Sequence, residues 1–197
     1  MGLMDLMVAM GLLMMLLTAL FVIFFLGGKA WRKTDDRYEL LRNTQAVVAQ
    51  FSREAERASA FSVSIIPGRA VSFLSPMNVA GNFVTDSLGD VRWERYLVFY
   101  LDVSTHEVRM VDVPLLSGSF ERRTPQPIER FISATGMHPL ADYLVGGRLL
   151  GRRITAFEPE LLPFSKHLRL HVHTIQPSTT QGRDLTLDLE GNAFLRN

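Results

Sequence analysis

The sequence contains no cysteine among its 197 residues, which excludes disulfide bonds and any metal site built on thiolates. It also lacks a surplus of charge of either sign. The formal net charge is +1, which gives no electrostatic reason to expect a nucleic acid as a partner. No Gly-x-Ser-x-Gly, P-loop or dinucleotide-binding motif occurs. We therefore predict no catalytic residue, no cofactor and no enzymatic activity.

The most informative absence is that of charge in the first part of the chain. No charged side chain lies between Asp5 and Lys29, and the residues between them are almost all apolar. At about 1.5 Å per residue, a helix of this length crosses a bilayer core of about 30 Å. The segment lacks the basic start, the short apolar run and the small-x-small site of a cleaved signal peptide. We therefore predict a retained, single-pass transmembrane helix over residues 1–28.

The residues that flank this helix bear on its orientation. Lys29, Arg32 and Lys33 follow the apolar run, and counted alone they place that flank in the cytoplasm. A short basic leader preceding Met1 would reverse the count, because the basic residues would then lie at the other end of the helix.

The sequence beyond the apolar run has the pattern of an amphipathic helix. Apolar residues recur there at steps of three and four and form one stripe: Leu41, Val48, Phe51, Ala55 and Ala58. We predict that the helix continues over residues 29–66, that Pro67-Gly68 ends it, and that the stripe packs on the domain that follows.

After Pro67 the apolar period changes to two, which indicates β-strands. The predicted strands are Ala70–Leu74, Arg95–Asp102, Glu107–Val113, Arg152–Phe157, His167–Thr174 and Leu185–Leu195. Between them we predict a loop at 117–127 and two short helices, Ile128–Thr135 and Leu140–Val145. Because one long helix precedes the strands, we predict an α+β fold in which the helix covers one face of an antiparallel sheet domain over residues 67–197.

One predicted strand carries the only cluster of histidines in the sequence. Alternation along it places His167, Arg169, His171 and His173, here called the histidine face, on one side of the strand. The alternatives are a metal site and the polar face of a half-buried strand. Arg169 on this side, and the lack of a carboxylate nearby in sequence, favour the second. Acidic residues near the C-terminus have strand spacing rather than the dense oxygen pattern of a calcium loop: Asp184, Asp188 and Glu190.

The carboxylate of Asp5 needs an explanation, because an ionised group at the lipid boundary is costly unless it is paired or near water. One alternative is that Asp5 caps the helix, where the macrodipole favours a negative charge near the N-terminus by about 0.3–1 kcal/mol. The other is an intermolecular pair with the α-amino group of a neighbouring chain. Subunits staggered along a filament would supply one such amine to each acid.

The opening residues Leu3-Met4-Asp5-Leu6-Met7-Val8-Ala9 resemble the Leu-Ile-Glu-Leu-Leu-Val-Ala signature of mature type IV pilins and type II secretion pseudopilins. In that register Met1 is the first mature residue, and Asp5 replaces the family's glutamate. Further segments are similar to minor subunits of the J-type pseudopilin and W-type minor pilin groups: Gln45–Ala58, Val71–Ser75, Tyr96–Asp102 and Phe194–Asn197. The resemblance therefore covers most of the chain.

This resemblance implies a pilin-like structural subunit. It implies a leader ending in glycine, cleavage by a prepilin peptidase and N-methylation of Met1. It also implies that the chain is held in the bacterial inner membrane, with its C-terminal domain in the periplasm, until the inner-membrane assembly platform moves it into a periplasmic or extracellular filament. Asp5 would pair with the N-terminal amine of an adjacent pilin or pseudopilin subunit, and a minor subunit with a large β domain is expected to prime assembly at the tip.

A second hypothesis belongs to another class. In it the chain is a single-pass envelope protein whose signal anchor tethers a binding or metal-dependent periplasmic domain. The histidine face would be the marker of that domain.

Overall fold

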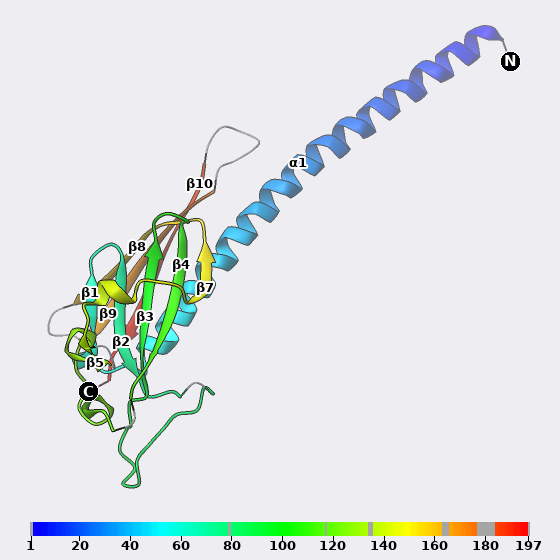
Figure 1. Cartoon of the computed structure of the whole chain (residues 1–197). Helices are drawn as coiled ribbons and strands as arrows, with labels where there is room; N and C mark the ends of the chain where they lie inside the picture. The colour runs from blue at the N-terminus through cyan, green and yellow to red at the C-terminus, as the bar shows by residue number, and fades with distance from the viewer. Residues whose placement is uncertain are drawn as a thin grey trace.

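The computed structural model of the chain describes residues 2–78, 80–116, 118–133, 136–162, 166–176 and 184–196, without the side chains of Asp5 and Lys33. Its architecture is a long N-terminal helix joined to a β-rich domain (Figure 1). The helix, α1 (Leu3–Ala55), projects from the domain over its first half and lies against the sheets over its second half. The predicted α+β fold, with one long helix packed on antiparallel sheets, is confirmed.

The helix ends at Ala55, whereas the sequence pattern predicts a helix as far as residue 66. The chain next forms the 3-10 helix η1 (Ala60–Ser62), and the Oγ of Ser59 caps it by accepting a hydrogen bond from the Phe61 N–H at 3.3 Å. Strand β1 (Ser64–Ile66) follows. The prediction is wrong over this stretch because its β-branched residues pair with a neighbouring strand instead of extending the helix.

The predicted strands belong to two antiparallel sheets. The larger sheet has the order β1-β2-β3-β4-β7 and the smaller has the order β10-β9-β8. Their further members are β2 (Ala70–Ser75), β3 (Arg95–Asp102), β4 (Glu107–Pro114), β7 (Arg148–Arg152), β8 (Ile154–Leu162), β9 (His167–Gln176) and β10 (Leu185–Phe194). A small ribbon consists of β5 (Ile132–Ser133) and β6 (Gly136–Met137). The predicted strand Arg152–Phe157 is divided between β7 and β8, because Arg153 has a φ of 62° and turns the chain.

The two short helices that the sequence predicts are single 3-10 turns in the structure. These turns are η3 (Ile128–Arg130) and η4 (Leu140–Tyr143), and residue Thr135 of the first prediction lies outside the described residues. A proline precedes each turn, and such short segments do not recover the cost of helix nucleation. A further 3-10 turn, η2 (Phe120–Arg122), lies in the predicted loop 117–127.

The main core lies where the second half of α1 meets both sheets. Phe51 is at its centre, with its ring centroid 6.2 Å from that of Phe73 and 5.6 Å from that of Phe99. Buried residues recur along the helix at steps of three and four: Leu40, Thr44, Val47, Phe51 and Ala55. Of the predicted stripe, Leu41 and Val48 are only partly buried and lie at its border.

Two glycines allow α1 to approach the sheets closely. A Cβ atom added at Gly151 on β7 would lie 2.6 Å from Cγ2 of Val47, and one added at Gly191 on β10 would lie 2.7 Å from Cγ1 of Val48. Both distances are shorter than carbon–carbon contact, so the helix sits directly on the backbone of both strands.

We expect Gly191→Ala to destabilise the domain by about 1–3 kcal/mol, because the added methyl group must displace Val48 or the helix itself. The measurement is the free energy of unfolding of the full chain in detergent micelles, from urea titration followed by circular dichroism. Thr186→Ala is the control, since Thr186 is exposed on the same strand and its loss should cost no more than about 1 kcal/mol. Equal effects of the two substitutions would contradict the close approach.

The face of the larger sheet that points away from α1 is also buried. Residues of the long connection after β4 cover it, and these include Leu115, Ile128, Phe131 and Leu140. Tyr96 lies beneath them and donates its hydroxyl hydrogen to the carbonyl oxygen of Gln126 at 2.7 Å. Burial raises the pKa of this phenol well above its ordinary value, so Tyr96 stays a neutral hydrogen-bond donor.

Candidate assembly helix and polar sites

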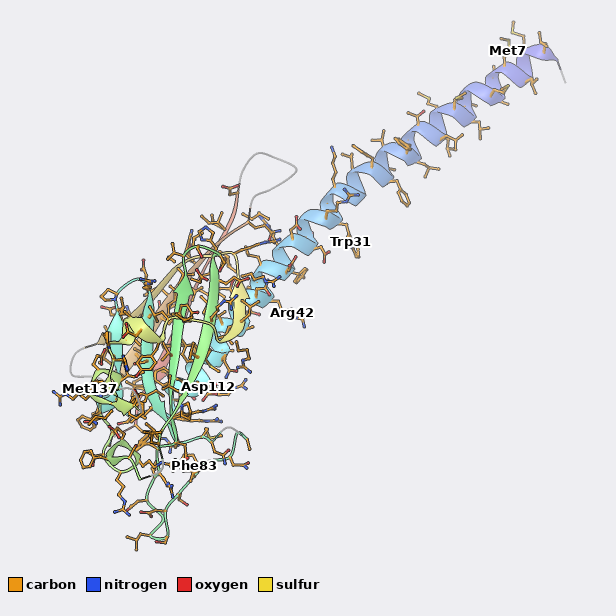
Figure 2. The ribbon with its side chains drawn as sticks, in the orientation of Figure 1. Met7, Trp31, Arg42, Phe83, Asp112 and Met137 are labelled. Carbon is orange, nitrogen blue, oxygen red and sulfur yellow. The ribbon has the colours of Figure 1, made fainter. Side chains whose placement is uncertain are left out.

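The first half of α1 is an apolar surface that the domain does not cover. Its side chains stand free of the domain, as Figure 2 shows for Met7 and for Trp31. The exposed side chains include Leu12, Leu16, Leu20, Phe21, Ile23, Phe24 and Leu26. This part of α1 is long and apolar enough to cross a membrane, and no residue of its most apolar stretch is buried inside the molecule.

The few polar groups of this half are satisfied or lie at its ends. Thr18 donates its hydroxyl hydrogen to the carbonyl oxygen of Met14 at 2.7 Å, so the hydroxyl needs no water. The ammonium nitrogen of Lys29 lies 4.4 Å from the ring centroid of Phe25, and Trp31, two residues further along the helix, is exposed. Aromatic and basic residues at the end of an apolar helix are typical of the membrane–water interface.

The helix is continuous from the apolar half into the core. Gly27 and Gly28 lie at the boundary, and neither breaks α1. A Cβ atom added at either would meet no other atom within 4 Å, so packing inside the molecule does not require these glycines.

The two residues that the family resemblance singles out lie at the start of the chain. Asp5 is in the first turn of α1, where a negative charge is favourable to the helix dipole. Met1 lies outside the described residues, as does the side chain of Asp5. Capping by Asp5 and pairing of Asp5 with a neighbouring amine therefore both stay predictions.

The alternation that the sequence predicts along β9 is confirmed. The four residues of the histidine face are partly buried and point away from the core, whereas Leu168, Leu170 and Val172 are buried. The side chains of His171 and His173 therefore lie on the same side of the smaller sheet.

The neighbouring strands supply carboxylates that sequence spacing alone does not reveal. The register places His171 opposite Glu190 of β10 and opposite Glu158 of β8. Nδ1 of His173 is in hydrogen-bond contact with Oδ1 of Asp188, and Nε of Arg169 lies 3.2 Å from Oε1 of Glu190. Such pairs across strands are common on the solvent side of a sheet.

The histidine face does not bring together a set of metal ligands within the described residues. No group of three or more histidine, aspartate or glutamate side chains there has the geometry to hold a metal ion. The ring of His167 instead stacks on that of Phe194, with centroids 4.6 Å apart. The alternative of a metal-dependent domain therefore gains no support from this face.

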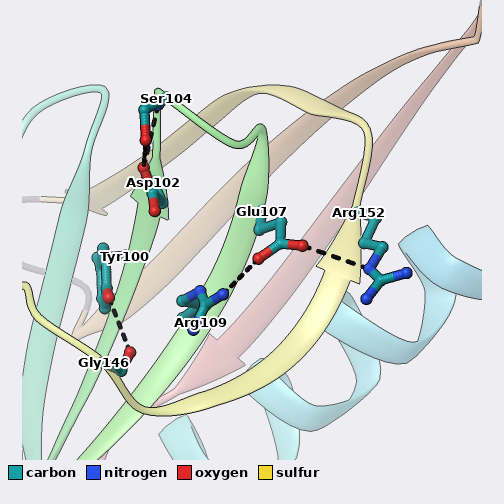
Figure 3. A network of polar contacts seen from close by, with 7 residues as sticks. All are labelled: Tyr100, Asp102, Ser104, Glu107, Arg109, Gly146 and Arg152. Carbon is teal, nitrogen blue, oxygen red and sulfur yellow. Dashed lines mark hydrogen bonds and ion pairs between the residues drawn. The ribbon is translucent and has the colours of Figure 1, made fainter.

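A polar network links the β3–β4 hairpin to β7 (Figure 3). Glu107 lies between two cations, with Oε2 2.6 Å from Nη2 of Arg109 and Oε1 3.3 Å from Nε of Arg152. At the turn of the hairpin, the side chain and backbone of Ser104 donate hydrogen bonds to Asp102, which lowers the pKa of that carboxyl group. Glu107 joins β4 to β7 through Arg152, whereas the contact between Asp102 and Ser104 stabilises the turn of the hairpin. These contacts have a structural explanation and do not indicate a reactive site.

The chain was compared with protein-family models, with curated proteins and with solved structures, and none of them matches it. The features of the chain that bear on its function are the sequence pattern and the geometry of α1. The first half of α1 is apolar and uncovered, and its second half is packed in the core of the β domain.

Proposed function

We propose that the protein is a minor pilin-like structural subunit, without catalytic activity, of a type II secretion pseudopilus or a type IV pilus. The observation that supports this most is α1, a continuous helix that is uncovered and apolar in its first half and part of the domain core in its second. An apolar surface of this extent needs cover from lipid or from other helices. In a subunit that is first held in a membrane and later packed in a helical filament, this surface is covered first by lipid and then by the helices of other subunits.

The proposed route starts in the bacterial inner membrane, with the C-terminal domain in the periplasm. The apolar half of α1 first lies among lipid tails, where its backbone is satisfied by its own hydrogen bonds. On assembly it exchanges lipid for the helices of neighbouring pilin or pseudopilin subunits. This exchange brings little hydrophobic gain, because lipid tails are as apolar as leucine side chains.

Because the exchange of lipid for protein helices brings little hydrophobic free energy, polar pairs within the apolar region decide how neighbouring helices are staggered along the filament. In this proposal the carboxylate of Asp5 pairs with the α-amino group of Met1 of an adjacent subunit. An unpaired charge in such surroundings costs several kcal/mol, whereas a paired one is largely compensated. A prepilin peptidase would create the amine at Met1, the inner-membrane platform would drive the exchange, and the large β domain suits a priming role at the tip.

The experiment that tests the proposal is mass spectrometry of the N-terminal peptide of the protein purified from its native membrane. We expect Met1 as the first residue, with one methyl group on its α-amine. The control is a strain that lacks prepilin peptidase, in which the N-terminal peptide should be longer and unmethylated. A formylated, acetylated or unmethylated initiator methionine at position 1 would contradict the proposal.

A further inference from the structure

A groove lies between two loops of the β domain. One of them, the loop between β2 and β3, extends to the end of the domain farthest from the start of α1 (Figure 1). One wall belongs to the long connection between β2 and β3 and includes Asp86 and Arg92. The other wall is the loop around η2 and includes Phe120, Arg122 and Arg123. We call this feature the arginine groove, and define it by Arg92, Phe120, Arg122 and Arg123.

The wall around η2 is held in place by Arg122. Its Nε and Nη2 donate hydrogen bonds to the carbonyl oxygens of Leu116 and Leu115, at 3.1 and 3.2 Å. Its Nη1 lies 3.0 Å from Oε1 of Glu94. Because Nε, Nη1 and Nη2 of Arg122 each contact a group of the protein, this mostly buried side chain shapes the groove. The side chains of Arg92 and Arg123 are more exposed to a ligand.

The opposite wall is also preformed, by a tight turn. Oδ1 of Asp86 accepts hydrogen bonds from the backbone N–H of Leu88 at 2.8 Å and from that of Asp90 at 3.0 Å. Gly89, with a φ of 87°, completes the turn. A groove with two ordered walls loses little conformational entropy when it binds a ligand.

The charge in the groove is positive. Arg92 contacts Glu94 through Nε, at 3.1 Å, and its side chain is 43% exposed. Arg123 is exposed in the same groove. The lining of the groove contains three arginines and one carboxylate, that of Asp86, and Glu94 contacts both Arg92 and Arg122. Cations therefore outnumber anions among the residues that line it.

The arginine side chains of the groove favour a ligand that carries carboxylates. The guanidinium fork of arginine matches a carboxylate in geometry and binds it through two parallel hydrogen bonds. Phe120 is 66% exposed beside the arginines and offers an apolar surface to a neighbouring side chain. Arginine and exposed aromatic residues together are typical of the anchor points of protein interfaces.

We propose that the arginine groove docks a segment of a partner protein that carries carboxylates next to apolar side chains. The inference goes beyond membership of a filament, because it assigns a contact to loops of the β domain rather than to α1. A nucleic acid is a poorer match, because it needs a longer basic surface than the arginines of this groove provide.

The test uses the full chain in lipid nanodiscs and a fluorescein-labelled peptide of alternating aspartate and leucine. Binding is measured by fluorescence anisotropy, with a peptide of alternating asparagine and leucine as the neutral probe. We expect saturable binding of the acidic peptide, and binding at least about tenfold weaker for the neutral one.

Two matched double variants separate the groove from general charge. Arg92→Gln with Arg123→Gln removes two groove cations, and we expect it to weaken binding of the acidic peptide by about tenfold or more. Arg69→Gln with Arg130→Gln removes two exposed cations outside the groove and should change binding by less than about twofold. Phe120→Asp is a further variant that places a carboxylate in the groove and should abolish binding.

The proposal is overturned if the two double variants weaken binding equally, or if the neutral peptide binds as tightly as the acidic one. It is also overturned if a single-stranded oligonucleotide binds the groove more tightly than the acidic peptide. The N-terminal mass spectrum of the protein is independent of all these outcomes, so failure here and failure of the filament proposal are distinguishable.

Discussion

Replacing Phe51 with alanine is expected to destabilise the β domain by about 3–5 kcal/mol. The side chain is fully buried between Phe73 and Phe99, and its loss leaves a cavity between the helix and the larger sheet. Since small domains are stable by only about 5–15 kcal/mol, this one change would remove a large share of the total. The measurement is urea unfolding of the full chain in detergent micelles, followed by circular dichroism.

Phe61→Ala is the matched control for this experiment. It deletes the same atoms a short distance beyond the end of α1, but at a side chain that is 63% exposed. We expect a loss of no more than about 1 kcal/mol. If the two substitutions cost the same, the second half of α1 is not part of the domain core.

If Asp5 pairs with a neighbouring amine as proposed, its replacement with alanine should reduce incorporation into filaments by more than about a hundredfold, because breaking a buried ion pair costs about 3–5 kcal/mol. Loss of a helix-capping charge alone would cost at most about 1 kcal/mol, or less than tenfold. The size of the effect therefore separates the two interpretations of Asp5. Incorporation is measured as the amount of the subunit in sheared filaments relative to the amount in the inner membrane.

Asp5→Glu is the control variant, because it keeps the charge and lengthens the side chain by one methylene group. It should assemble at least as well as the unchanged chain. Both variants should remain in the membrane after alkaline extraction, since the apolar half of α1 is unchanged. Normal incorporation of Asp5→Ala would refute the pairing role.

The regular elements of this fold could be predicted from the sequence because each hydrophobic pattern persists over many residues. The apolar run before Lys29, the continuous apolar run around Tyr100 and the alternation around His171 each extend over most of an element. The end of α1 could not be predicted, since residues 56–66 contain apolar residues that suit either a helix or a strand. Residues 64–66 form a strand because they pair with β2, and a local sequence pattern does not indicate that contact.

The histidine face and the arginine groove likewise depend on contacts between segments that are distant in the sequence. The sequence predicts which residues of β9 share a face, but not that Glu158 and Glu190 lie on either side of His171, because strand order is a property of the whole sheet. The arginine groove as a whole could not be predicted from the sequence. Its walls come from two loops without periodicity, and the only local signal is the charged and aromatic cluster that begins at Arg92.

The close seating of α1 on Gly151 and Gly191 has a geometric consequence for any assembly that contains this chain. The glycines fix both the height and the rotation of the helix relative to the sheets. Each residue of an α-helix advances by about 1.5 Å and turns by about 100°. The number of residues between Leu26 and Leu40 therefore sets the rotation of the β domain about the helix axis, relative to the apolar half of α1. Inserting one residue there would rotate the arginine groove by about 100° relative to the apolar half of α1, while the core contacts of the second half of α1 would stay as they are.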